Sequence, residues 1–139
     1  MPMLTDMGYG FSYCTGLIKA ILPKITNVPS LGFRDCTSLK MLDFSNLTSI
    51  GGDYNDKAFV GCTALDTIIL RGNTICEIGD TTFDGYSEDE NTPFAVGGTG
   101  GTVYVPEALI ESYKTAENWS TLYNAGTCNF VAIEGSEYE

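Results

Sequence analysis

The chain has 139 residues, which suits a single domain, and its net charge of −11 comes from 18 acidic and seven basic residues with no histidine. The charge is uneven, because residues 1–72 carry six Lys or Arg against six Asp or Glu, whereas residues 73–139 carry one against 12. Nucleic acid and anionic lipid both need a basic footprint. We therefore expect no nucleic-acid partner and interpret the acidic half as a solubilising surface.

The same composition argues against an enzyme. Without histidine, the commonest general base and the Ser/His and Cys/His nucleophile systems are excluded. The Asp and Glu pairs do not sit at a spacing that forces two carboxylates into one pocket. No apolar run approaches the ~20 residues of a membrane span, and the N-terminus has no pattern of a signal peptide. We expect no catalysis, no cofactor and no direct membrane insertion.

A seven-residue pattern, F-x-x-C-T-x-L, occurs three times, at residues 11–17, 33–39 and 59–65. Its cysteines are 22 and 26 residues apart, a range typical of a solenoid of stacked coils. We expect copies at about 11–32, 33–58 and 59–82, and an incomplete copy at 83–105. The predicted structural core of the repeats is Phe11, Cys14, Leu17, Phe33, Cys36, Leu39, Phe59, Cys62, Leu65 and Phe83.

Each copy predicts one short strand and a second apolar pair. Counted from each cysteine, the third, sixth and eighth following residues are apolar in all three copies, as in Leu39, Leu42 and Phe44. This spacing predicts a strand that is buried on one face. The pair that follows, such as Leu47 and Ile50, recurs after a turn. A single coil cannot bury this stripe, so the copies must stack on one another.

The cysteines at 14, 36 and 62 are expected to be reduced and inert. Equivalent side chains of stacked strands lie about 4.8 Å apart, beyond the Cβ separation of about 3.5 to 4.5 Å that a disulfide needs. Cys76 and Cys128 stand outside this series, and the sequence leaves their state open. No C-x-x-C spacing is present, and the absence of histidine leaves a poor ligand set for zinc.

Two loops interrupt the repeats. The segment GGDYNDK, 51–57, carries the four extra residues of the second copy, and DGYSEDENTPFAVGGTGGT, 84–102, replaces the cysteine and leucine positions of the fourth. Insertions in repeat proteins gather on one face and often bind, although insertion loops are also simply tolerated surface, and both interpretations stay open. The candidate binding residues are Asp53, Tyr54, Asn55, Asp56 and Tyr86.

The segment DTTFDGYSEDEN, 80–91, partly matches a calcium loop, with Asp80 and Asp84 as candidate ligands. The third ligand position holds Thr82, and Asn91 replaces the closing glutamate. This composition favours a solvated acidic loop over a metal site. The glycines of GGTGGT, 97–102, precede a predicted strand and lack a following lysine, so they indicate a flexible linker and not a phosphate-binding turn.

The C-terminal part predicts a helical cap. Val103 and Val105 predict a strand that stacks as the last coil, and Pro106 followed by an acidic residue marks a helix start. We expect a helix over 106–118 that covers the open end of the stack, with 119–125 turning back over it and a short strand at 130–133. The predicted division is a repeat solenoid over 1–105 and a helical cap with tail over 106–139.

The pattern F-x-x-C-T-x-L-x-x-I/L, closed by Ile-Gly at 50–51 and 78–79, resembles the BspA-like (Treponema pallidum-type) leucine-rich repeat. The resemblance covers residues 4 to about 85 and departs at Val28-Pro29, where Ile-Gly is expected. It implies a leucine-rich-repeat solenoid of short parallel strands in a right-handed coil with a C-terminal capping helix. Residues 102–126 resemble the closing segment found after such repeats in proteins of gut bacteria and their phages.

The resemblance implies a non-catalytic, extracellular binding or adhesion module of a bacterial cell-surface protein, which recognises protein or glycan on host or bacterial surfaces through its repeat loops. The alternative is a structural or receptor-binding component of a phage or prophage particle, located in the virion. Leu4 and Met7 already occupy repeat positions, so the first coil has no visible cap. We therefore expect an upstream domain or self-association at that end.

Overall fold

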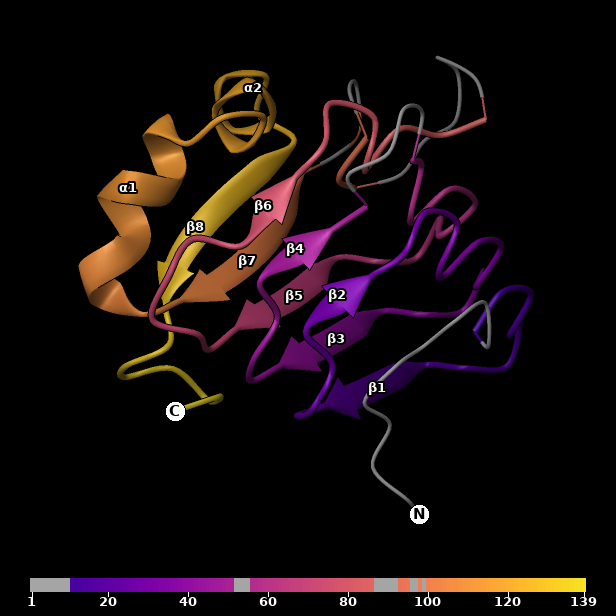
Figure 1. The fold of residues 1–139 in the computed structure, drawn as a ribbon, viewed down its shortest axis with the longest axis horizontal. Helices are drawn as coiled ribbons and strands as arrows, with labels where there is room; N and C mark the ends of the chain where they lie inside the picture. The colour runs from indigo at the N-terminus through magenta and orange to yellow at the C-terminus, as the bar shows by residue number, and fades with distance from the viewer. Residues whose placement is uncertain (1–10, 52–55, 87–92, 96–97, 99) are drawn as a thin grey trace.

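The computed structural model describes residues 11–51, 56–86, 93–95, 98 and 100–139. Short strands form two parallel sheets, ordered β1-β3-β5-β7-β8 and β2-β4-β6, which face each other (Figure 1). In chain order, the elements are β1 (Lys19–Leu22), β2 (Asn27–Val28), β3 (Met41–Phe44), β4 (Ser49–Ile50), β5 (Thr67–Leu70), β6 (Glu77–Ile78), β7 (Gly101–Val105), a 3₁₀ helix (Glu107–Leu109), α1 (Ile110–Thr115), α2 (Trp119–Asn124) and β8 (Cys128–Ala132).

The sequence repeat and the strand register coincide. β1, β3 and β5 each begin five residues after a cysteine of the pattern, and Ala20, Leu42 and Ile68 are partners across them. In the second sheet, Val28 pairs with Ile50, which pairs with Ile78. The predicted strands and second apolar pairs are therefore confirmed, and the whole is a β-rich repeat fold.

Phenylalanines stack between neighbouring copies of the repeat. The rings of Phe11 and Phe33 lie 5.3 Å apart between centroids, Phe33 and Phe59 5.6 Å, and Phe59 and Phe83 5.0 Å, all in stacked geometry. Phe94 extends the row, 5.3 Å from Phe83. Such pairs add about 0.5 to 1.5 kcal/mol beyond the burial of their area. Each copy of the repeat is thus held mainly by its immediate neighbours.

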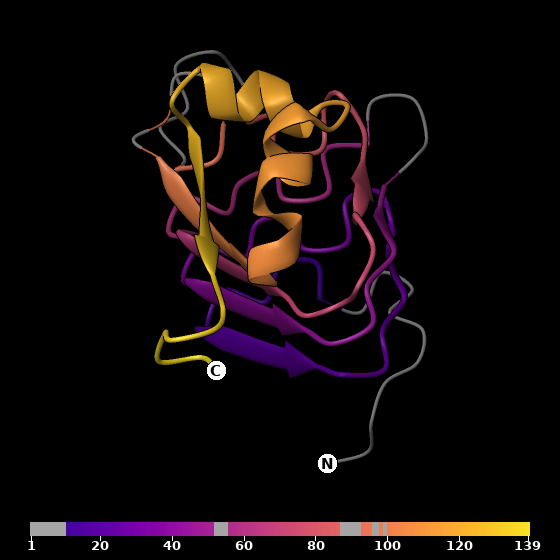
Figure 2. The ribbon, with the colours of Figure 1, turned by 90° about the vertical axis from the view of Figure 1, so that its left-hand side faces the viewer.

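The C-terminal part differs from its prediction. The single helix expected over 106–118 is wrong, because a 3₁₀ helix leads into α1, which ends at Thr115, and residues 119–124 form α2. Asn118 lies between the two helices and has a positive φ of 66°. β8 pairs in parallel with β7, so β8 and not β7 is the last strand of the sheet. Figure 2 shows α1 and α2 between β8 of one sheet and β6 of the other.

Side chains of α1 and α2 reach the repeat next to β6. The Tyr113 hydroxyl accepts a hydrogen bond from the backbone N–H of Cys76 at 2.9 Å, and Trp119 Nε1 donates to the Cys76 carbonyl at 2.7 Å. Both aromatic rings are buried. Gly101, which the sequence assigned to a flexible linker, begins β7 and packs against Phe94. No helix in the described part of the chain has the length and apolarity needed to cross a membrane.

Candidate binding surface

The turn before each repeat cysteine has a fixed backbone conformation. Tyr13, Asp35 and Gly61 occupy the same position of successive copies and have φ values of 63°, 58° and 82°. The turns bond to one another, because the Tyr13 N–H donates to the Arg34 carbonyl at 2.6 Å and the Asp35 N–H donates to the Val60 carbonyl at 2.8 Å. A left-handed conformation is uncommon for residues other than glycine and costs of order 1 kcal/mol or more. The stacking of the copies therefore imposes it on Tyr13 and Asp35.

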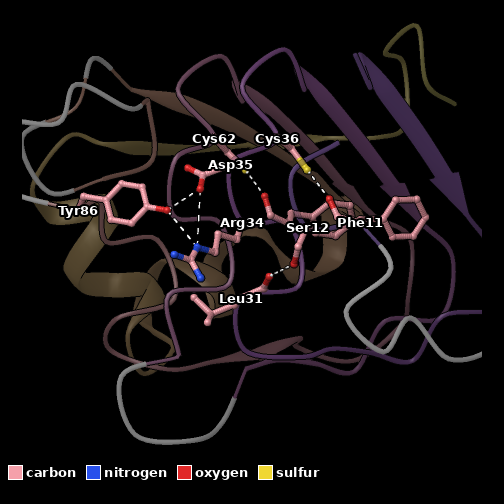
Figure 3. A network of polar contacts seen from close by, with 9 residues as sticks. Phe11, Ser12, Leu31, Arg34, Asp35, Cys36, Cys62 and Tyr86 are labelled. Carbon is pink, nitrogen blue, oxygen red and sulfur yellow. Dashed lines mark hydrogen bonds and ion pairs between the residues drawn. The ribbon is translucent and has the colours of Figure 1, made fainter. Parts of the chain in front are cut away.

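Four side chains from three copies meet on these turns, as Figure 3 shows for three of them. Arg34 Nε donates to the Tyr86 hydroxyl at 3.1 Å, and this hydroxyl donates to Asp35 Oδ2 at 2.7 Å. The Arg34 guanidinium also lies over the Tyr13 ring, 5.2 Å from its centroid. We call Tyr13, Arg34, Asp35 and Tyr86 the turn cluster. Tyr13 and Tyr86 are 58 % and 53 % exposed, so the cluster faces solvent.

The turn cluster carries fixed charges and hydrogen-bonding groups. Partial desolvation, together with the hydrogen bond to Asp35, raises the pKa of Tyr86, so its hydroxyl keeps its proton at neutral pH. The Arg34 guanidinium is always charged and is held from two sides, by the Tyr86 hydroxyl and by the Tyr13 ring. The surface thus presents two aromatic rings, one cation and one carboxylate in a defined arrangement.

Of the five predicted binding residues, the structure places Tyr86 in the turn cluster. Asp53, Tyr54 and Asn55 lie outside the described residues. Asp56 is 0 % exposed, so it is an interior residue and not part of the solvent-facing surface.

The contacts of Asp56 explain the glycines of the Ile-Gly pairs at 50–51 and 78–79. Its carboxylate accepts a hydrogen bond from Thr82 Oγ1 at 3.0 Å and another from the Ala58 N–H at 3.4 Å. A Cβ on Gly51 or Gly79 would overlap this carboxylate, and Gly51 also has a φ of 68°. The two glycines therefore leave the space in which Asp56 links neighbouring copies.

Tyr13, Arg34 and Asp35 were not among the binding residues predicted from the sequence. The signal lay in the pattern F-x-x-C itself, because its two variable positions fall on a turn between a residue packed in the core and a cysteine. Identical positions of stacked copies lie side by side, so a tyrosine, an arginine and an aspartate there are neighbours in space although 22 residues separate the copies.

All five cysteines lie in the described part of the chain, and none of them forms a disulfide. Cys36 Sγ donates to the Phe11 carbonyl at 2.8 Å, and Cys62 Sγ donates to the Phe33 carbonyl at 3.0 Å, so each thiol links its coil to the preceding one. The hydrogen bond with Cys36 and burial raise the pKa of Cys62. Burial also raises the pKa of Cys76 and of Cys128 to about 12. Protonated and buried, the thiols of Cys62, Cys76 and Cys128 are poor nucleophiles and poor metal ligands.

The weak calcium candidates do not gather into a site within the described residues. No group of three or more metal-ligating side chains occurs there. Burial raises the pKa of Asp84.

A groove of about 440 Å³ lies between the second sheet and the junction of α1 with α2. Its lining includes Cys76, Asn118 and Trp119. Two of its polar groups are already used inside the chain, because Asn118 Nδ2 donates to the Ile78 carbonyl at 2.8 Å and Trp119 Nε1 donates to Cys76. Hydrogen bonds between α2 or the residue before it and the repeat thus join the walls of the groove.

Comparison with known proteins places these repeats in a family. A search of curated proteins and a search of solved structures found no match. A family model described as "BspA type Leucine rich repeat region (6 copies)" matches residues 7–95. The match spans more than half of the chain and includes all three copies of the pattern as well as the turn cluster. The chain therefore belongs to the BspA-type leucine-rich repeat family.

Proposed function

We propose that the chain is a non-catalytic module that binds a protein partner through the turn cluster. Leucine-rich repeats are generally protein-binding modules, which supports this class of function. The observation that carries the proposal is the exposed pair Tyr13 and Tyr86 around the Arg34 guanidinium. Tyrosine and arginine are enriched among the residues that contribute most to protein interfaces.

The arrangement suits binding because it is organised in advance. Arg34 and Tyr86 each give up side-chain freedom when the chain folds, since hydrogen bonds and a ring contact already hold them. Binding of a partner to these side chains therefore costs less conformational entropy. The entropy cost that usually opposes association is about 0.5 to 1.5 kcal/mol for each immobilised side chain.

We further propose that the chain is an extracellular adhesion module on a bacterial surface. BspA-type leucine-rich repeat proteins are typically surface-associated, which supports this location. In this proposal, Asp53, Tyr54 and Asn55 of the insertion loop extend the contact surface, for a protein or a glycan. The repeats over 1–105 form a solenoid, and the segment 106–139 ends it. The buried Tyr113 and Trp119 and their bonds to Cys76 support that ending.

The test is binding of the fluorescently labelled chain to immobilised host matrix proteins and, in parallel, to intact bacterial cells. Arg34→Gln and Tyr86→Ala should each weaken matrix binding by about tenfold or more, as expected for residues central to an interface. Lys24→Gln is the matched control, because it removes the same charge from an exposed position outside the turn cluster. Tyr54→Ala tests the insertion loop.

Equal binding by the Arg34 and Lys24 variants would refute the turn cluster as the contact surface. Binding confined to bacterial cells would contradict adhesion to a host and favour a receptor-binding role in a phage particle. Binding to neither surface would count against an adhesion module altogether.

A further inference from the structure

The outer face of the five-stranded sheet is covered at its centre and open at β1. Ile21, Asp43, Ile69 and Tyr104 are successive partners across β1, β3, β5 and β7. Ile21 is 59 % exposed, whereas Asp43 is 8 % and Ile69 0 % exposed. Ile69 alternates with core residues of β5, so it points away from the core cluster between the sheets. Another part of the chain must therefore cover it.

The end of the chain contacts this face. After β8 the chain bends back and ends beside the sheet (Figures 1 and 2). The Tyr138 ring meets the Tyr104 ring edge-on, with centroids 4.7 Å apart and planes at 69°. Arg71 Nη1 donates to the Tyr138 carbonyl at 2.7 Å. We call residues 134–139, with the sequence EGSEYE, the tail.

Arg71 is oriented by Asp43. Arg71 Nε and Nη2 donate to the two carboxylate oxygens of Asp43 at 2.8 and 2.9 Å, a paired geometry that fixes the plane of the guanidinium. This orientation points Nη1 at the main-chain carbonyl of the neighbouring segment, which here is that of Tyr138. Since Asp43 balances the charge of Arg71, this arrangement recognises a peptide carbonyl and an adjacent aromatic ring.

The tail is attached to the sheet mainly through Tyr138. The Ser136 and Glu139 N–H groups bond locally, to the carbonyls of Ile133 and Ser136. Glu137 and Glu139 are exposed on either side of Tyr138. Outside Tyr138, Glu134 Oε1 accepts an exposed hydrogen bond from the Glu107 N–H at 2.9 Å. A segment that bonds largely to itself and is held by so few contacts detaches at low cost.

We propose that Asp43, Arg71 and Tyr104 form a peptide-binding site, which the tail occupies within the same chain. The site takes a segment of a partner protein that carries a tyrosine flanked by acidic residues, in place of the tail. This site lies on residues other than those of the turn cluster, so it stands independently of the proposed function. Because a tethered segment acts at an effective concentration of the order of mM, the tail excludes weaker peptides until it is displaced.

The test uses a synthetic, fluorescently labelled peptide with the sequence IEGSEYE of residues 133–139, and fluorescence anisotropy as the readout. The intact chain is compared with a chain that lacks 134–139. Removal of the tail should tighten peptide binding at least tenfold. The control peptide IEGSEAE and an Arg71→Gln substitution in the shortened chain should each weaken binding at least tenfold. Circular dichroism checks that each variant is folded.

The intact chain carrying Tyr138→Ala supplies a second measurement that keeps all residues in place. It should bind the peptide at least threefold more tightly than the unsubstituted chain, because the ring that competes with the peptide is gone. The proposal is overturned if the folded Tyr138→Ala chain binds no more tightly than the intact chain, or if the two peptides bind alike.

Discussion

Asp56 is a buried carboxylate that joins neighbouring copies of the repeat. Its oxygens accept hydrogen bonds from Thr82 Oγ1 and the Ala58 N–H, and Thr82 Oγ1 in turn accepts the Gly79 N–H at 2.8 Å. Removal of one member of such a network leaves the remaining buried polar groups without partners. The energetic cost then exceeds the net value of the hydrogen bonds themselves.

We predict that Asp56→Ala lowers the free energy of unfolding by about 1 to 3 kcal/mol, the cost of leaving a buried partner unsatisfied. This change in unfolding free energy is measured by urea unfolding, followed through the fluorescence of Trp119, the single tryptophan. Asp66→Ala is the matched control, because Asp66 is exposed and its loss should change stability by less than about 0.5 kcal/mol. Similar values for both variants would contradict the structural role of Asp56.

The sequence could not single out Asp56. Its loop, GGDYNDK, has two aspartates and one asparagine, and the excess of four residues indicates only an insertion at the surface. Which carboxylate turns inward depends on Thr82, 26 residues away, and on the space left by Gly51 and Gly79. For Tyr86 the sequence was sufficient, because its position in an interrupted copy predicts a surface residue.

The buried thiols predict a dependence of stability on pH. Burial raises the pKa of Cys76 and Cys128 to about 12 from an ordinary value of 9.0. The unfolded chain therefore loses these protons first as the pH rises. Each thiol contributes stability that is present below the unfolded pKa and is lost as the pH rises toward the folded pKa.

Between pH 7 and 8 the melting temperature should hardly change through these groups, and above about pH 9 it should fall. Each thiol contributes about 1.4 kcal/mol per pH unit once the unfolded form is ionised. Thermal melts from pH 7 to 10 measure the slope, and Cys128→Ala should reduce it. An unchanged slope in that variant would show that other groups control the alkaline limit.

At the scale of the elements, the repeat predicted β1 to β6 well, because the apolar positions of each strand recur in every copy. The C-terminal part is not repeated in the sequence, and its local periodicity wrongly indicated a single helix over 106–118. Ala116 adopts an extended conformation with ψ of 150°, and Asn118 then turns so that Trp119 reaches Cys76. These bonds to the repeat outweigh the preference of residues 106–118 for one helix.

The phenylalanine row makes a prediction for the stacking of the coils. Phe59 lies between Phe33 and Phe83, so Phe59→Ala removes two ring contacts and leaves a cavity. The expected loss of unfolding free energy is about 3 to 5 kcal/mol, measured in urea. Ile18→Ala, a large-to-small change at a residue that is 60 % exposed, should cost much less. Equal losses would mean that the rings do not couple adjacent coils.

For the whole molecule, charge repulsion opposes the compact state. The chain carries −11, and residues 73–139 hold one basic residue against 12 acidic ones. The described residues form three ion pairs. The Arg34–Asp35 and Lys114–Glu111 pairs include exposed side chains, so they contribute little to stability. Repulsion spread over one half of the chain thus outweighs the attraction that salt would screen.

We therefore predict that stability rises with ionic strength. Between 10 and 200 mM NaCl the Debye length falls from about 30 Å to below 10 Å, so repulsion between acidic side chains weakens while the partly buried Asp43–Arg71 pair is screened less. Screening worth about 1 kcal/mol would raise the melting temperature by roughly 3 to 4 °C. Thermal melts in NaCl measure this rise, and a fall in melting temperature would show that attractive pairs dominate. Melts in CaCl₂ at matched ionic strength give the control. A larger rise in melting temperature than in NaCl would mean that Asp80 and Asp84 bind calcium, whereas equal rises would mean that screening accounts for the whole effect.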